Sequence, residues 1–376
     1  MAAESHALLG ASSAKRWLEC TPSARASERF EDRPSAYADE GTRAHLLCEH
    51  KVRKALSLNP EPLPEGVEFD GEMEECSEQY LSFVLELVSK AKEPIPAVEA
   101  RVDFSDVVPE GFGTADFILI SGDAIHIVDY KHGKGVEVSA ERNPQMMLYA
   151  YGALNAYGAI YDLERVSMTI FQPRLGNVST YETTRGELER WANDYVKPRA
   201  EMAWRGEGEL CDGPWCRFCK CKATCRKRAE SAMELARHEF KDPALLSDEE
   251  IAEVLGKAEE VASWAADVKD YALGEALKGK RFPGWKVVEG RSIRKLSDEA
   301  KAAEAVLAIG KDPYEKKLLS ITDLTKLLGR KRFDELLGAL VYKPPGKPTL
   351  APESDKRPEY SPAANAADDF NDNKEE

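Results

Sequence analysis

Two apolar segments separated by a short turn constrain the fold of this chain more than any other feature. Residues 113–120 read GTADFILI, residues 124–131 read AIHIVDYK, and SGD lies between them. Apolar runs on either side of a Gly-Asp turn predict a β-hairpin. If Gly122 and Asp123 form the turn, Ser121 faces Ala124 and, counting back along both strands, Asp116 faces Asp129. The pattern therefore predicts two carboxylates opposite each other in an apolar hairpin.

Two facing carboxylates need a compensating charge. Cβ atoms of directly opposed residues lie about 4.5–5.5 Å apart, where like charges destabilise a sheet, and burial increases the cost. A divalent cation between them removes the conflict. Lys131 projects to the same side as Asp129 because side chains alternate along a strand. Such a group can bind a hard metal, activate water and hold a phosphate; a surface hairpin with scattered acids is the alternative.

The segments around the hairpin predict an α/β core with a mixed sheet. Asn143 and Pro144 combine a capping residue with a first-turn proline, which predicts the start of a helix through QMMLYAYGALNAYG. On one face of that helix lie Gln145 and Tyr149, a polar pair suited to a phosphate or a metal-bound water. Apolar periodicity predicts two earlier helices and two more strands, at residues 35–57, 72–92, 98–104 and 165–171.

Five of the eight cysteines lie between Cys211 and Cys225. The longest apolar runs are too short to cross a bilayer, and no secretory signal is recognisable at the N-terminus. We therefore expect a cytoplasmic protein, where a tight cysteine cluster more often binds metal than forms disulfides.

The net charge of −15 argues against extensive coating of a polyanion, but charge is a local property. Residues 211–230 carry six basic side chains against two acidic ones. A basic patch of this kind is compatible with a local nucleic-acid contact, and also with an ordinary solvated surface. The candidates for DNA contact are Arg217, Lys220, Lys222 and Arg226.

The ordered motifs resemble those of RecB-like nucleases in the PD-(D/E)XK superfamily. The cysteine spacing, a C-x2-C-x5-C triplet after the core and one cysteine before it, resembles the iron–sulfur branch that includes the AddB nuclease domain and the CRISPR adaptation nucleases. The SAKRWLECTPSARAS and FQPR segments look most like phage and prophage exonucleases of this branch. The motifs are EGTRAH with His45, GTAD with Asp116, DYK with Asp129 and Lys131, and QMMLY with Gln145 and Tyr149.

The resemblance implies a restriction-endonuclease-like core and a metal-dependent DNA exonuclease. His45, Asp116, Asp129 and the Tyr130 carbonyl would bind Mg²⁺ or Mn²⁺, and Lys131 would stabilise the charged transition state. Gln145 and Tyr149 would complete the catalytic site, with Glu99 as a weaker candidate. The implied substrate is single- or double-stranded linear DNA ends in phage recombination, in a bacterial host cytoplasm, with a recombinase or annealing protein as a possible partner.

The same resemblance implies a [4Fe–4S] cluster held by Cys20, Cys216, Cys219 and Cys225. Four thiolates can also bind zinc tetrahedrally, and a zinc site of Cys211, Cys216, Cys219 and Cys225 is the alternative. In the cluster interpretation Cys211 and Cys221 are spare. Cys48 and Cys76 are expected to be small core residues.

Three regions are expected along the chain. Residues 1–235 form the nuclease core with its cysteines, residues 236–345 form a mostly helical C-terminal domain, and residues 346–376 form a flexible acidic tail. Within the second region, helices are expected at 247–279, 298–309 and 321–340, with a short strand pair around 284–296. A non-catalytic DNA-binding or scaffold protein with the same fold is the alternative function.

Overall fold

The computed structural model describes residues 7–30, 36–236, 248–288, 299–308, 313–314 and 318–341. The chain divides into two units. One contains residues 1–248 and 257–286, and the other contains residues 249–256 and 287–376. The tail expected at 346–376 lies outside the described residues. No helix in the described ranges is both long and apolar enough to span a bilayer.

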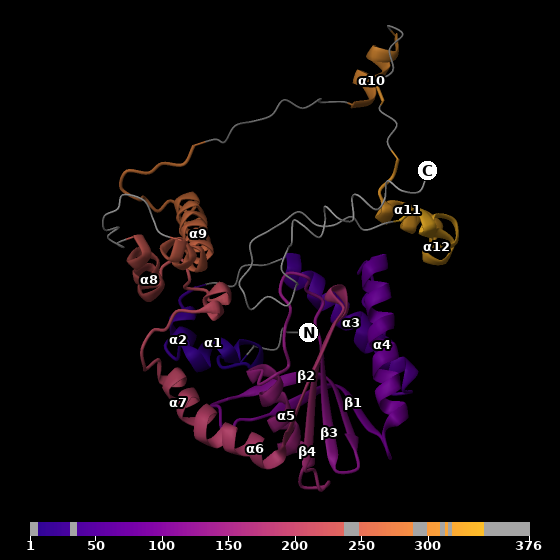
Figure 1. The fold of residues 1–376 in the computed structure, drawn as a ribbon, viewed down its shortest axis with the longest axis vertical. Coiled ribbons are helices and arrows are strands. Elements are labelled where there is room, and N and C mark those ends of the chain that lie inside the picture. The colour runs from indigo at the N-terminus through magenta and orange to yellow at the C-terminus, as the bar shows by residue number, and fades with distance from the viewer. Residues whose placement is uncertain are drawn as a thin grey trace. The chain divides into compact units, whose positions relative to one another are not determined.

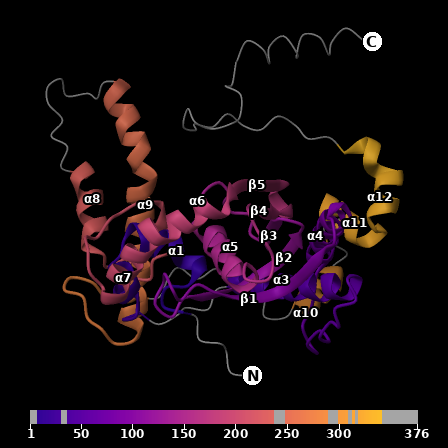
Figure 2. The same ribbon diagram turned by 90° about the horizontal axis from the view of Figure 1, so that it is seen from below.

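The first unit is built on a mixed five-stranded sheet, which confirms the predicted α/β class. The strands follow one another across the sheet in the order β1 to β5 (Figure 2). β3 and β4 pair in parallel, and the other neighbours are antiparallel. The strands are β1 (Ile95–Asp103), β2 (Phe112–Ser121), β3 (Ala124–Tyr130), β4 (Arg165–Gln172) and β5 (Asn177–Thr184).

The hairpin register predicted from the Gly122-Asp123 turn is the observed one. Ser121 pairs with Ala124, and pairing continues to Phe117 and Val128. Asp116 and Asp129 are the next residues along the two strands. The turn and the apolar runs thus fix which residues of β2 and β3 meet.

Helices cover both faces of the sheet. On one face, α3 (Ala36–Ala55) and α4 (Gly71–Lys90) lie side by side along one flank of the strands (Figure 1). They enclose an apolar core with Phe117, Leu119 and Val128. On the other face, α5 (Pro144–Tyr157) packs against the alternate side chains of the same strands. Because both faces are covered, β2 and β3 are apolar almost throughout, as buried strands are.

Short N-terminal helices and the helical segment after β5 complete the apolar core on the α5 face of the sheet. Trp17 is fully buried there, and its indole N–H donates to the Gly10 carbonyl at 3.1 Å. The helices after β5 carry buried Leu188, Val196 and Ala203 into the same core. These elements are α1 (Ala14–Glu19), α2 (Ser23–Ser27), α6 (Arg185–Arg190), a π-helical stretch (Trp191–Val196) and α7 (Lys197–Arg205), with 3₁₀ turns at Ala11–Ser13 and Pro173–Leu175.

The predicted start of α5 is confirmed. The Asn143 side chain accepts hydrogen bonds from the backbone N–H groups of Gln145 and Met146, at 3.0 and 3.4 Å. Pro144 occupies the first turn, where its missing N–H costs nothing. This cap fixes Gln145 at the beginning of the helix that crosses the sheet.

Beyond the core, a 3₁₀ turn (Pro214–Phe218) precedes α8 (Arg226–Ala236), and α9 spans Asp248–Leu277. The second unit contains α10 (Glu299–Ala308), α11 (Ile321–Leu328), α12 (Arg330–Leu337) and a 3₁₀ turn at Gly338–Leu340.

Two expectations for this part were wrong. The helix expected over 321–340 is broken at Gly329, whose φ of 75° lies in the left-handed region that ends helices. Residues 284–288 are not a strand; the rest of that expected strand pair, residues 289–296, lies outside the described residues.

Candidate metal centre

The centre begins at an interruption in the pairing of β1 with β2. Val98 pairs with Phe117 and Ala100 pairs with Ala115, but Glu99 and Asp116 between them are not paired. Glu99 has a φ of 48°, a conformation that side chains other than glycine rarely adopt and that is held only by surrounding structure. The break lets both carboxylates leave the regular alternation of the strands.

His45 of α3 meets these two carboxylates. Its Nδ1 lies 3.4 Å from Asp116 Oδ1, and the Tyr130 backbone N–H donates to Asp116 Oδ2 at 2.6 Å. One ligand atom from each of His45, Glu99 and Asp116 lies within 4.8 Å of the other two. The three residues therefore form a group that could hold a metal ion, and Glu99 belongs to it.

Asp129 lies beside this group in a second cluster of polar contacts. It is buried, and Lys131 Nζ lies 2.9 Å from its Oδ2. Gln145 joins the two, accepting from Lys131 Nζ at 3.1 Å and donating to Asp129 Oδ1 at 3.3 Å. Gln145 also donates to the Tyr149 hydroxyl at 3.1 Å. The structure thus brings together all five side chains expected from the hairpin and from α5.

A close backbone approach holds Tyr149 in place. A methyl group at Gly113 would lie 2.6 Å from Tyr149 Cε1, which is nearer than real contacts allow. The first residue of the GTAD motif therefore has no side chain because the Tyr149 ring occupies that space. Within the motif, Gly113 admits the tyrosine and Asp116 supplies the carboxylate.

The electrostatics of the centre are those of crowded carboxylates. Burial, then the neighbouring Asp116, raises the pKa of Glu99 to about 8. Burial also raises the pKa of Asp129, although Lys131 opposes the shift. Burial disfavours the charged form of His45, but Asp116, Asp129 and Glu99 outweigh it and raise the pKa of His45 to about 9. The three carboxylates are therefore balanced by protons and by Lys131, and a bound cation could take the place of those protons.

The donor set fits a divalent metal ion. Carboxylate oxygens are the ligands of Mg²⁺, and an imidazole nitrogen beside them also suits Mn²⁺. Asp129 lies next to this donor set, and its buried Oδ2 already faces the Lys131 ammonium at 2.9 Å.

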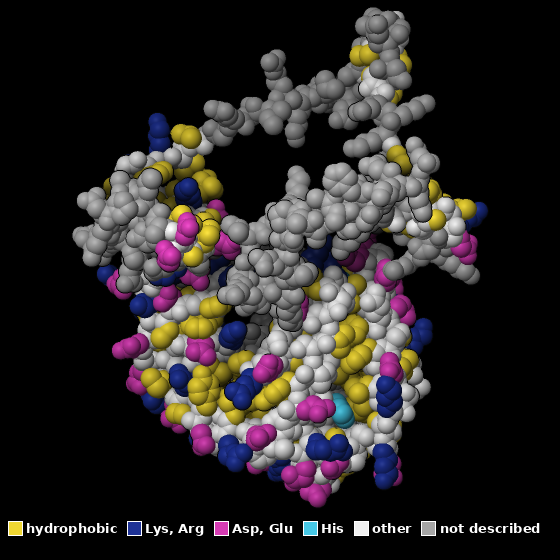
Figure 3. All heavy atoms as spheres, viewed as in Figure 1, with side chains coloured by type: hydrophobic (Ala, Val, Ile, Leu, Met, Phe, Trp, Pro, Cys, Tyr) yellow, Lys and Arg dark blue, Asp and Glu magenta, His cyan; other side chains and the backbone are white. Residues whose placement is uncertain are grey.

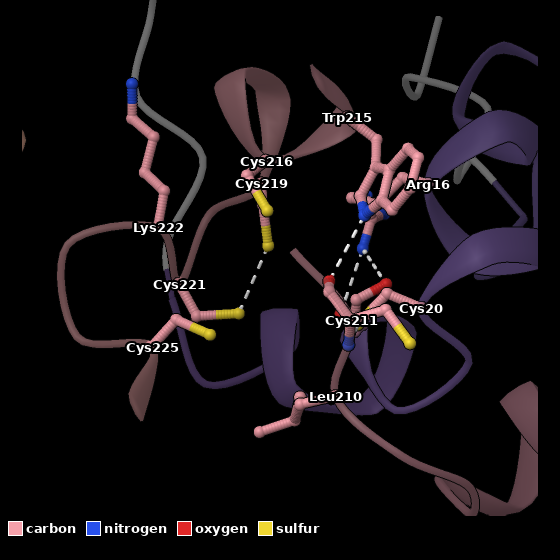
Figure 4. Close-up of a pocket in the computed structure, with 11 residues that line it drawn as sticks. Arg16, Cys20, Leu210, Cys211, Trp215, Cys216, Cys219, Cys221, Lys222 and Cys225 are labelled. Carbon is pink, nitrogen blue, oxygen red and sulfur yellow. Dashed lines mark hydrogen bonds between the residues drawn. The ribbon is translucent and has the colours of Figure 1, made fainter. Parts of the chain in front are cut away.

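The cysteines gather at a second place in the same unit. One pocket is lined by Cys20 at the end of α1 and by all five cysteines of the 211–225 segment. Figure 4 shows Cys20 and Cys211 on one side of this pocket and the other four on the opposite side. The four residues expected to hold a cluster thus line the same pocket, and so do the two expected to be spare. Cys48 and Cys76 lie instead in the core under α3 and α4.

Contacts and burial shift the pKa values of the pocket thiols in different directions, and burial raises the pKa of Cys20. The Cys211 backbone N–H donates to Cys20 Sγ at 3.5 Å, and the sulfurs of Cys219 and Cys221 lie 3.3 Å apart. The bond with Cys221, assisted by Arg16, holds the pKa of Cys219 below its usual range. In the described part of the chain no three of these sulfurs lie within 4.8 Å of one another.

The basic residues of this segment differ in their surroundings. Lys222 forms an ion pair with Asp267 of α9 at 2.8 Å, and so does Arg228 at 2.6 Å. Arg217, Lys220 and Arg226 are exposed. Elsewhere on the face seen in Figure 3, described acidic and basic side chains are intermixed.

Residues 6–358 match a family described as "Protein of unknown function (DUF2800)". The chain belongs to the DUF2800 family. Two crystal structures resemble this DUF2800 chain. A "Putative exonuclease" from Eubacterium rectale is 16% identical, with a TM-score of 0.32, covering 54% of this chain and 85% of its own. SSO0001 is 15% identical, with a TM-score of 0.23, covering 48% and 94%. Such scores do not establish a shared fold, so the functional argument rests on the site of this DUF2800 chain.

Metal affinity of this centre should rise with pH. Both His45, with a pKa of about 9, and Glu99, with a pKa of about 8, hold a proton at pH 7 that a bound metal must displace. Each displaced proton makes affinity rise about tenfold per pH unit until the pKa is passed. Calorimetric titration with Mn²⁺ in buffers of different ionisation enthalpy measures both affinity and proton release.

Two variants calibrate that experiment. Glu99→Gln should remove one displaced proton, whereas His126→Asn should change nothing, because His126 pairs with Leu119 farther along the hairpin. An affinity that stays constant from about pH 6 to about pH 9, where both groups begin to lose their protons, would contradict the assigned ligands.

Proposed function

We propose that this chain is a metal-dependent DNA exonuclease with a PD-(D/E)XK-type core. The observation that carries the proposal is the group of possible metal ligands formed by His45, Glu99 and Asp116. Beside it, Gln145 is hydrogen-bonded to both Lys131 and Asp129. Acidic metal ligands next to a half-buried lysine suit phosphodiester hydrolysis. The ordered motifs of the sequence resemble the same nuclease class.

His45, Glu99 and Asp116 would hold Mg²⁺ or Mn²⁺, with Asp129 and, by resemblance, the Tyr130 carbonyl as further ligands. The bound ion would supply Lewis acidity toward a phosphate oxygen and lower the pKa of the attacking water. The Tyr130 N–H orients the Asp116 carboxylate through its 2.6 Å bond. The protein thus fixes the ligands before any metal arrives.

Lys131 would contact the phosphate. Burial disfavours its charged form, but Asp129 and Asp116 outweigh that effect and raise the pKa of Lys131. It therefore carries a full positive charge at neutral pH, and its side chain remains 29% exposed. Gln145, held by Tyr149, keeps the ammonium in position. An ammonium in this position stabilises the negative charge that develops on the phosphoryl group.

The exposed basic residues beside the cysteine pocket would meet the DNA backbone. Arg217 lies over the ring of Phe218, which is 77% exposed, so the segment offers a base-stacking surface as well as charge. Lys222, paired with Asp267 and less exposed, would contribute less than Arg217 and Arg226. A setting in phage recombination, with a recombinase or annealing partner, follows from the resemblance alone.

The cysteine pocket would hold a [4Fe–4S] cluster through Cys20, Cys216, Cys219 and Cys225. Four thiolates are the ligand set such clusters require, and the pocket offers them with an N–H donor already directed at Cys20. A cluster there would join the end of α1 to the segment after α7. Zinc held by Cys211 in place of Cys20 is the competing assignment.

Replacing a central carboxylate should abolish degradation of linear DNA. Asp116→Asn and Asp129→Asn should each lower the rate by about 10²–10³, the size of effect seen when a group that stabilises transition-state charge is lost. The assay uses 5′- and 3′-labelled linear DNA and closed circular DNA with Mg²⁺, Mn²⁺ or EDTA.

Asp123→Asn is the matched control, because this carboxylate is 53% exposed at the hairpin turn and pairs with Arg165. Full activity of Asp129→Asn would disprove the site assignment. DNA binding without hydrolysis by the wild type, with either metal, would favour the scaffold alternative.

A pair of cysteine variants separates the two metal assignments. If a cluster is present, Cys20→Ser should lose iron and the brown colour of an anaerobic preparation. Cys211→Ser should keep both, because of these two cysteines only Cys20 is assigned as a cluster ligand. Metal content by mass spectrometry, with visible absorption, is the measurement. One zinc per chain without iron, lost in Cys211→Ser and kept in Cys20→Ser, would reverse the assignment.

Neutralising the exposed bases should reduce the salt dependence of DNA binding. Each lost phosphate contact lowers the slope of log K against log salt by about one. A triple variant with Gln in place of Arg217, Lys220 and Arg226 should therefore lower the slope by about two to three. Fluorescence anisotropy without divalent metal measures this. Lys222→Gln should change the slope less; an unchanged slope in the triple variant would move the DNA contact elsewhere.

A further inference from the structure

Arg174 is a buried guanidinium that binds three separate parts of the core. It follows β4 in the Pro173–Leu175 turn, and its side chain is only 4% exposed. Nη1 donates to Glu40 of α3 at 3.0 Å and to the His132 carbonyl at 3.2 Å. Nη2 donates to Glu72 of α4 at 2.7 Å. One side chain therefore connects two helices and the segment after β3.

Such an arrangement is not the simplest way to stabilise a fold. Moving a charge out of water is costly, and well-packed apolar residues often stabilise a fold equally well. The hydrogen bonding of the guanidinium is also incomplete. Its Nε is buried and has no acceptor among the described residues. A buried ion network is better explained when its geometry serves the neighbouring site.

The first connection leads from Arg174 to His45. Glu40 lies on α3 five residues before His45, so the ion pair fixes the end of the helix that carries the imidazole. Farther along α3, Arg53 donates to the Val98 carbonyl at 2.8 Å, next to the strained Glu99. Two arginine contacts, one on each side of His45, thus set the position of α3 against the sheet.

The second connection leads from Arg174 to Asp116. The His132 carbonyl accepts from Arg174, and the His132 ring hydrogen bonds through Nδ1 to the Tyr130 hydroxyl at 2.8 Å. The Tyr130 backbone N–H donates to Asp116, and its ring lies edge-on to His45 with centroids 5.4 Å apart. Both members of the His45–Asp116 pair are therefore connected to the same guanidinium.

We propose that Arg174 is a positioning residue for the metal centre: through Glu40 and His132 it holds α3 and the end of β3 at the spacing that lets His45 and Asp116 bind one ion. The proposal rests on the proposed function. It assigns unequal roles to the two carboxylates that Arg174 binds. Glu40 transmits position to His45, whereas Glu72 secures α4, which contributes no residue to the centre.

The test compares Glu40→Gln with Glu72→Gln in the full-length chain. Each change removes one carboxylate charge from the same guanidinium. Mn²⁺ affinity is measured by electron paramagnetic resonance of the free ion, and thermal unfolding is measured on the same samples. Glu40→Gln should weaken Mn²⁺ binding about tenfold or more, as loss of a ligand-orienting partner does, while Glu72→Gln should stay within about twofold.

Arg174→Lys and Arg174→Gln extend the comparison. Lysine keeps the charge but lacks the fork that reaches several acceptors, so affinity should rank wild type, then Lys, then Gln. Should Arg174→Gln fail to fold, the Glu40 and Glu72 pair still decides.

Equal Mn²⁺ affinities in Glu40→Gln and Glu72→Gln would overturn the positioning role and leave the proposed function intact. A wild type that binds no Mn²⁺ and degrades no DNA would overturn the proposed function, and this inference with it.

Discussion

The interrupted pairing between β1 and β2 is the constraint on which the candidate centre depends. In a regular ladder, Glu99 and Asp116 would face each other as like charges. The break instead directs them to His45, at the cost of a strained backbone at Glu99. Strain of this kind persists only where surrounding structure enforces it, and it is concentrated at functional sites. Here the apolar core under α3 and α4 and the Arg53 contact to Val98 provide that enforcement.

The parts of the structure that follow from local patterns could be predicted from the sequence. The hairpin register follows from Gly122-Asp123, the start of α5 follows from Asn143-Pro144, and apolar runs or alternation locate four of the five strands. β5 was not predicted because its alternating exposed residues, NVSTYETT, are nearly all polar. The position of Glu99 could not be predicted either, because it depends on a positive φ inside a strand, and ordinary alternation places that side chain elsewhere. Arg174 was visible only as part of FQPR, since its partners lie over 30 residues away in sequence.

Long-range contacts give the core its organisation. Arg174 joins residues 40, 72 and 132. The cysteine pocket joins Cys20 to Cys211, which lies 191 residues later in the chain. The Arg174 contacts bear on the metal centre, which takes side chains from α3, β1, β2 and β3. The cluster of basic residues next to the cysteines then lies in the same unit as the metal centre.

The account stands on one claim, that His45, Glu99 and Asp116 bind a single divalent ion. Anomalous diffraction from crystals grown with Mn²⁺ tests it most directly. We predict a manganese peak within coordination distance of the His45 imidazole and of both carboxylates, absent from crystals of Asp116→Asn. Manganese bound elsewhere, with His45 and Asp116 still in direct contact, would contradict the account.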